Sequence, residues 1–241
     1  MKDKLLQVKD LSAGYPGRTV VSGLSFEAGA GETVALMGPN GCGKTTLLRS
    51  VCGIIAPVSG EILLNDSSVR YMDRREIARK VAFVPQLSEP LPGFTVEEIV
   101  FMGREPYKDL FSMASKDDAA AVAGALKRTG SWEIRERDVS ELSGGEYQRI
   151  LIARALAQGT DMILLDEPTA HLDLRHQIDV LTLLNNMNDK LVIAVMHDLH
   201  LTKKYFGRAV LLKDGKVHDD GIPPDILNAV NIKEVFGVNE S

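Results

Sequence analysis

The sequence predicts an α/β fold built around a parallel β-sheet. Short apolar runs that suit buried strands alternate along the chain with segments of helical spacing, and strands alternating with helices form parallel sheets. A glycine-rich loop lies between one such strand and the helix that follows it, and no internal repeat is visible. One α/β unit is therefore expected in these 241 residues, without a tandem second copy.

The N-terminal part is expected to form an antiparallel β layer that leads into a buried strand. Apolar and polar residues alternate from Leu6, which indicates short strands, and turns are marked by Gly14, Pro16 and Gly17. The apolar run at 33–37 follows as a buried strand, and a helix is expected to begin near Lys44. The next strand lies at 80–85, where a proline ends it.

The middle of the chain has a different character. At Thr95 a segment with apolar residues at helical spacing begins, and residues 119–126 are rich in alanine, which favours helix. We therefore expect one domain, 1–241, whose core comprises 1–86 and 158–241 and whose inserted helical lobe spans 87–157.

The strand and helix pattern resumes after the lobe. Strands are expected at 162–165, 191–196 and 209–212, with a helix at 176–187 between the first two. The last strand is expected to meet Val217 across a hairpin turn at Asp214-Gly215.

Composition narrows the class of protein. Apolar residues make up 44% and charged residues 25% of the chain, a mixture typical of folded globular domains. The longest apolar stretches, such as 191–196, are far shorter than the roughly 20 residues that cross a bilayer, so a cytosolic protein is expected. The net charge of −5 is spread without a basic patch, which argues against nucleic acid as a partner. Cys42 and Cys52 fit a reducing compartment and are too few for a closed zinc site.

The strongest motif is a phosphate-binding loop between the strand at 33–37 and the following helix. Glycines let backbone N–H groups turn toward phosphate oxygens, and the helix N-terminus adds partial positive charge there. The residues expected to bind ATP are Gly38, Pro39, Asn40, Gly41, Cys42, Gly43, Lys44, Thr45 and Thr46. Lys44 is expected to reach the terminal phosphates, and the Thr45 hydroxyl is a ligand for Mg²⁺.

An acidic pair follows the strand at 162–165. Parallel sheets place ligands at the carboxyl ends of their strands, so these side chains are expected beside the phosphate loop. Asp166 is expected to hold Mg²⁺, and Glu167 to act as the general base that polarises the attacking water. Without the phosphate loop, such a pair would more often be a helix cap.

A second anion-binding helix start lies at Leu142-Ser143-Gly144-Gly145, before an apolar run at 150–157. Together with the phosphate loop and the acidic pair, this segment resembles the signature of the ABC ATPase family, a group of P-loop NTPases. The resemblance covers nearly the whole chain. It implies that Ser143, Gly144 and Gly145 bind the γ-phosphate of ATP held by a second copy, in a head-to-tail dimer that encloses two ATP molecules.

Four further positions match the family one at a time. The resemblance implies that Tyr15 stacks on adenine and that Gln86 touches Mg²⁺ or water. It implies that His197 contacts the γ-phosphate and orients water, and that Asp173 communicates across the dimer, although the residues before Asp173 depart from the commonest family form. The remaining histidines could suggest a metal site, but isolated histidines are more often structural, and we treat as structural His171, His176 and His200.

The resemblance also suggests which machine the chain drives. A single ATPase without membrane spans is typical of importer subunits, and three segments resemble the iron-chelate, haem and cobalamin branch: 94–98, 103–107 and 170–177. This implies membrane permease subunits as partners, an extracytoplasmic substrate-binding protein as an indirect partner, and a peripheral position at the cytoplasmic membrane face. Two alternatives stay open: a soluble ABC ATPase of macromolecular assembly or repair, and a regulatory nucleotide-binding module.

Overall fold

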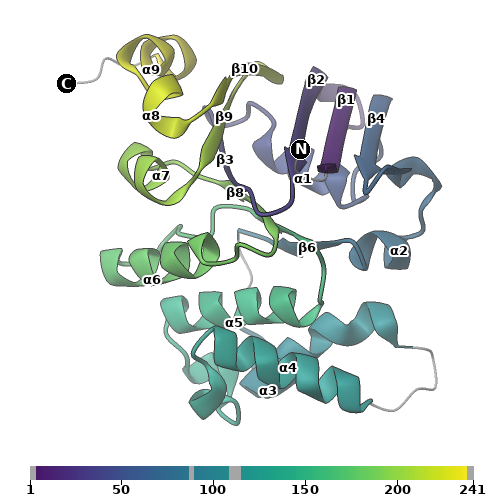
Figure 1. Ribbon diagram of the computed structural model, residues 1–241, viewed down its shortest axis with the longest axis vertical. Helices are drawn as coiled ribbons and strands as arrows, with labels where there is room; N and C mark the ends of the chain where they lie inside the picture. The colour runs from purple at the N-terminus through teal and green to yellow at the C-terminus, as the bar shows by residue number, and fades with distance from the viewer. Residues whose placement is uncertain (1–3, 87–89, 109–114, 238–241) are drawn as a thin grey trace.

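The computed structural model describes residues 4–86, 90–108 and 115–237, which form two sheets flanked by helices (Figure 1). The first sheet is antiparallel with the order β2-β1-β4-β5, made of β1 (Lys4–Tyr15), β2 (Arg18–Gly29), β4 (Ser59–Leu64) and β5 (Ser67–Ser68). The second has the order β10-β9-β3-β8-β7-β6. Its strands are β3 (Thr33–Met37), β6 (Val81–Val84), β7 (Met162–Leu165), β8 (Leu191–Val195), β9 (Arg208–Lys213) and β10 (Lys216–Gly221).

The antiparallel layer confirms the expected topology but not the expected strand length. The first two strands each run for 12 residues, so the prediction of short strands is wrong. Irregular pairing between Val8 and Leu11, with Asp10 at φ 46°, interrupts the alternation that marks a continuous strand. Two further strands, β4 and β5, were not anticipated; the left-handed pair Asn65 and Asp66 forms the turn between them.

The central sheet confirms the predicted parallel arrangement. β3 pairs in parallel with β8 and β9, and β7 pairs in parallel with β6 and β8. Alternate residues of β3 face different cores: Leu36 packs in the core shared with the antiparallel layer, and Met37 in the core shared with the helices. At the edge, Val217 pairs with Leu212 across the turn at Asp214-Gly215, as predicted.

The described residues between 90 and 157 are mostly helical and lie to one side of the sheets, as the teal helices at the bottom of Figure 1. They form α3 (Val96–Phe101), η2 (Met102–Tyr107), α4 (Lys116–Arg128), η3 (Trp132–Ile134), η4 (Val139–Glu141) and α5 (Gly144–Ala157). Capping boxes begin α3, α4 and α5. The lobe boundaries at 87 and 157 stay a prediction, and residues 87–89 lie outside the described part.

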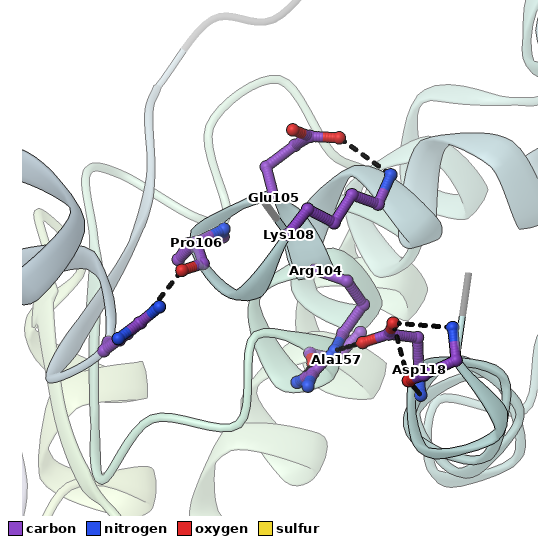
Figure 2. A network of polar contacts seen from close by, with 8 residues as sticks. Arg104, Glu105, Pro106, Lys108, Asp118 and Ala157 are labelled. Carbon is purple, nitrogen blue, oxygen red and sulfur yellow. Dashed lines mark hydrogen bonds and ion pairs between the residues drawn. The ribbon is translucent and has the colours of Figure 1, made fainter. Parts of the chain in front are cut away.

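Arg104 fastens three parts of this helical region together (Figure 2). From η2 its Nε donates to Asp118 of α4 at 2.8 Å, and its Nη1 donates to the carbonyl of Ala157 at the end of α5 at 2.8 Å. Nearby, Arg79 donates to the carbonyl of Pro106 at 2.9 Å, so the segment η2 is also tied to the core beside β6.

The other helices surround the central sheet. They are α1 (Lys44–Val51), η1 (Val69–Tyr71), α2 (Arg74–Ala78), α6 (Leu174–Asn185), α7 (Leu199–Tyr205), α8 (Pro223–Ile226) and α9 (Ala229–Phe236). The α6 helix begins two residues before the predicted 176–187 because Asp173 caps it. The C-terminal α8 and α9 were not anticipated. Among the described residues, none of the helices has the length and hydropathy needed to span a bilayer.

Candidate functional site

The loop between β3 and α1 has the backbone conformation that its glycines were predicted to permit. Gly38 has φ 150° and Gly43 has φ 108°, a region that residues with a Cβ rarely adopt. A Cβ on Gly38 would lie 2.2 Å from the carbonyl oxygen of Leu212, and one on Gly43 would lie 2.7 Å from the side chain of Val21. Both glycines are therefore required by close approach as well as by backbone conformation.

Lys44 brings a positive charge to the centre of this loop. It is the first residue of α1, only 6% exposed, and its Nζ donates to the carbonyls of Gly38 at 2.7 Å and Pro39 at 3.0 Å. The ammonium group and the N-terminus of α1 thus point positive charge at the same space, which is the electrostatic requirement of a phosphate site.

Two oxygen ligands meet beside the loop. The Thr45 hydroxyl donates a hydrogen bond to Oδ1 of Asp166 at 3.1 Å. The backbone N–H of Asp166 donates to the carbonyl of Val84, the last residue of the neighbouring strand β6. Burial raises the pKa of the Asp166 carboxyl, and the hydrogen bond from Thr45 opposes that shift. A hydroxyl and a carboxylate at this separation are the hard oxygen donors that Mg²⁺ prefers.

Glu167 is held between side chains from the two neighbouring strands. Its Oε2 accepts a hydrogen bond from Gln86 Nε2 at 2.6 Å, and its Oε1 lies 2.9 Å from Nε2 of His197. Glu167 itself has φ 51°, an unusual backbone conformation for a residue with a side chain, which is a feature common at functional sites. The three residues follow β6, β7 and β8, so the ends of adjacent parallel strands bring them together.

Residues of the phosphate loop, Gln86 and Glu167 line a common cleft of about 440 Å³. Its lining contains Tyr15, Arg18, Val20, Asn40, Gly41, Gly43, Lys44, Thr45, Thr46, Gln86 and Glu167. Tyr15 is 45% exposed, and its hydroxyl accepts a hydrogen bond from Arg49 at 3.2 Å. Its place in the cleft suits the predicted stacking on adenine. Arg18 and Val20 were missed because no motif marks them; their only signal is their position just after Tyr15.

The predicted second phosphate site lies elsewhere on the chain. Ser143 caps α5 and shares a capping box with Glu146, whose pKa is lowered chiefly by the Ser143 backbone N–H. Ser143 and Gly144 are exposed to solvent, whereas Gly145 is buried. None of the three lines the cleft, and neither does Asp173, which caps α6. Within one chain, the structure therefore brings together the phosphate loop, Gln86 and Glu167, but not the signature.

No metal cluster accounts for the remaining histidines among the residues that the structure covers, since no group of three His, Cys, Asp or Glu side chains is placed to hold an ion. His176 instead lies 2.9 Å from Oδ1 of Asp173 through its Nδ1. The structural role that the sequence suggests for His171, His176 and His200 stays a prediction.

A phosphate loop after β3, beside a carboxylate pair that follows β7 of the same parallel sheet, is typical of nucleoside triphosphatases. The family described as ABC transporter matches residues 21–170. The petrobactin import ATP-binding protein FpuD of Bacillus anthracis is 40% identical over 236 residues, which are 97% of this chain and 86% of FpuD. The chain therefore belongs to the ABC transporter family and is one of its ATP-binding, ATP-hydrolysing subunits.

Solved structures agree with this assignment. A metal-chelate type ABC transporter in an inward-facing conformation aligns with a TM-score of 0.85 and 31% identity, covering 98% of this chain and 90% of that one. A dimeric ATP-binding cassette in a post-hydrolysis state, bound to ADP and phosphate, aligns with a TM-score of 0.76 and 28% identity, covering 90% and 98%. The α/β fold with an antiparallel layer and an added helical region is thus confirmed.

Proposed function

We propose that this chain is the ATP-hydrolysing subunit of an importer for a metal chelate such as an iron-siderophore, haem or cobalamin complex. The observation that carries the proposal is the similarity, over nearly the full length, to a petrobactin import protein and to a metal-chelate transporter. A soluble ABC ATPase of macromolecular assembly or repair is the alternative, and a regulatory module that barely hydrolyses ATP is a third. Two of the proteins compared above are named for import or transport, which favours the first.

The chemistry that we propose uses the groups of the cleft. The phosphate loop and Lys44 bind the phosphates of ATP, and Tyr15 stacks on the base. Thr45, Asp166 and Gln86 would hold Mg²⁺, which neutralises charge on the transferring phosphoryl group when bound. The 3.1 Å contact between Thr45 and Asp166 supports this ligand set.

Glu167 is the proposed base. Its two oxygens contact Gln86 and His197, so the carboxylate is oriented from both sides before a water molecule is engaged. His197 positions that water against the γ-phosphate, and Lys44 stabilises the charge that develops there. The positions of Gln86, Glu167 and His197, which follow the adjacent strands β6, β7 and β8, support the roles proposed for Glu167 and His197.

A second copy of the chain completes each site. None of Ser143, Gly144 and Gly145 lines the cleft, so we propose that they contact ATP held by the partner copy. Asp173 would lie at the same contact. Closure of this head-to-tail dimer would move the helical lobes, and that motion would act on the permease.

The proposed machine is a membrane complex. Two copies of the chain would bind permease subunits at the cytoplasmic face as peripheral subunits, and the permease would receive substrate from an extracytoplasmic binding protein. We propose that the segment just after Gln86 passes this motion to the permease; residues 87–89 of that segment lie outside the described residues.

The test is a pull-down with tagged Glu167→Gln protein from detergent-solubilised membranes, with ATP and with ADP. Removing the base while keeping the shape should lower ATP hydrolysis on the order of 100-fold or more and trap the closed dimer. Recovery of a multispanning permease supports import, whereas recovery of soluble proteins alone favours the assembly function. Glu133→Gln, an exposed carboxylate of η3 that does not line the cleft, is the matched control and should behave like the parent.

A further inference from the structure

The loop from Glu167 to Asp173 joins the proposed base to the start of α6, and several contacts hold it. The N–H of Ala170 donates to the carbonyl of Glu167 at 3.1 Å. Gln177, from the first turn of α6, donates to the carbonyl of Thr169 at 3.3 Å. The loop is therefore closed on itself at its beginning by a backbone hydrogen bond and tied in its middle to α6.

Asp173 is held at the end of the same loop by His176. Its Oδ1 accepts a hydrogen bond from the backbone N–H of His176 at 2.9 Å and lies 2.9 Å from the ring Nδ1 of the same residue. The Asp173 side chain is 67% exposed, whereas that of His176 is 27% exposed. The more buried histidine therefore holds a carboxylate that faces solvent.

The other side of the His176 ring lies against the signature. A Cβ built on Gly145 would be 2.2 Å from Cδ2 and 2.3 Å from Cγ of His176, so the ring rests directly on the glycine backbone. One turn further along both helices, Arg149 Nη1 of α5 lies 3.5 Å from Asp179 Oδ2 of α6. The beginnings of α5 and α6 thus pack as one body, with His176 at the point of closest approach.

We propose that His176 is a positioning residue that fixes Asp173 and the signature in one arrangement, so that both meet a second copy of this chain together. This inference rests on the proposed dimer. It adds the residue that holds together the two parts of each chain that would face the partner copy, Asp173 and the signature. His176 is not among the residues that line the cleft. Its effect is therefore on the assembly of the composite site and on turnover, and not on the binding of ATP by one chain.

The experiment compares three substitutions in the full-length chain. His176→Ala removes both contacts, His176→Asn keeps a donor near the position of Nδ1, and His176→Phe keeps a ring on Gly145 without that donor. His200→Ala is the control, because this exposed histidine of α7 has no assigned role. Steady-state hydrolysis gives kcat and KM, and light scattering in the Glu167→Gln background gives the ATP concentration for half dimerisation.

For His176→Ala we expect kcat to fall about tenfold and half dimerisation to need about tenfold more ATP, the loss that corresponds to one charged hydrogen bond. KM for ATP should stay within twofold of the parent value. His176→Asn should recover most of the loss because it restores the donor to Asp173. If His176→Ala proves less stable by thermal melting, the Phe variant, which keeps the packing, carries the comparison and should show reduced kcat at unchanged melting temperature.

Two results would overturn the inference. If the Glu167→Gln chain dimerises with ATP, but the His176 variants match the unsubstituted chain in kcat and match Glu167→Gln in the ATP concentration for half dimerisation, the histidine has no positioning role and the proposed function stands. If the parent itself stays monomeric at saturating ATP, the composite dimer fails and the inference fails with it.

Discussion

The contact between Arg104 and Asp118 offers a direct test of what holds the helical region together. Asp118 accepts hydrogen bonds from Arg104 Nε at 2.8 Å and from the Ser115 hydroxyl at 2.8 Å, and its side chain is 10% exposed. The guanidinium of Arg104 also lies 4.1 Å from the centre of the Tyr107 ring. Asp118→Asn keeps the size of the side chain and removes its charge.

The expected cost follows from the burial of the pair. Removing one partner of a buried ion pair leaves the other charge uncompensated, which typically costs about 3 kcal/mol or more. The Arg104 side chain is 13% exposed, so water can only partly replace the lost carboxylate. In a chain of this size, about 3 kcal/mol corresponds to a fall in melting temperature of about 6–12 °C.

Thermal melting followed by circular dichroism measures this, with Asp117→Asn as the control. Asp117 is the neighbouring residue in α4, is exposed, and undergoes the same chemical change, so its melting temperature should stay within about 2 °C of the parent. Equal melting temperatures for the Asp118 and Asp117 variants would refute the claim that the buried pair stabilises the fold.

The same pair predicts a pH dependence. Hydrogen bonds from Arg104 and then Ser115 lower the pKa of Asp118 to about 2, below its value in the unfolded chain. A lowered folded-state pKa gives stability that is present above the unfolded pKa and is lost as the pH falls through the folded one. The difference in stability between parent and Asp118→Asn should therefore be constant near neutral pH and shrink between about pH 4 and pH 2.

The remaining predictions concern the site and the packing of its helices. Lys44→Ala should weaken ATP binding on the order of 100-fold in a fluorescent-nucleotide titration, because a buried charged donor is lost; binding within threefold of the parent would contradict the assigned role. Gly145→Ala should lower the melting temperature by about 2–12 °C through overpacking, and adding His176→Ala should restore part of it. Additive effects in that double variant would argue against the contact. Gly103→Ala should lower the melting temperature, because its Cβ would lie 2.3 Å from a carbonyl oxygen of α5. Gly124→Ala should instead raise the melting temperature by about 1–4 °C, because this α4 position has open space around it and alanine favours helix.

The elements that sequence patterns predicted well are those with a strong local signal. The buried strand β7 has the predicted bounds because four consecutive apolar residues are followed by charge. A place for Glu167 at the carboxyl end of its strand was expected for the same local reason. The strand order β8-β7-β6, which brings Gln86, Glu167 and His197 together, was not predicted, because it depends on tertiary pairing.

Other parts depend on tertiary contacts that leave little trace in the sequence. β4 begins with three exposed residues and shows no alternation there, so its pairing with β1 gives it strand structure. Arg18 reaches the cleft because the antiparallel layer packs beside the phosphate loop, and no local pattern encodes that approach. The contact of His176 with Gly145 joins residues from different helices and was likewise invisible.

The contacts of His176 connect the two parts of one chain that would act on different ATP molecules, namely Glu167 and the signature. The loop that begins at Glu167 ends at Asp173, and Asp173 is held by the ring that packs on Gly145. A continuous series of contacts therefore runs from the proposed base, which acts on ATP in its own chain, to the signature, which would act on ATP of the partner. Coupling needs an element with two discrete arrangements, and a loop whose first residue has a strained φ of 51° is the place where such a change would begin. Substitutions at His176 should consequently alter both sites of a dimer, even when only one copy carries the change.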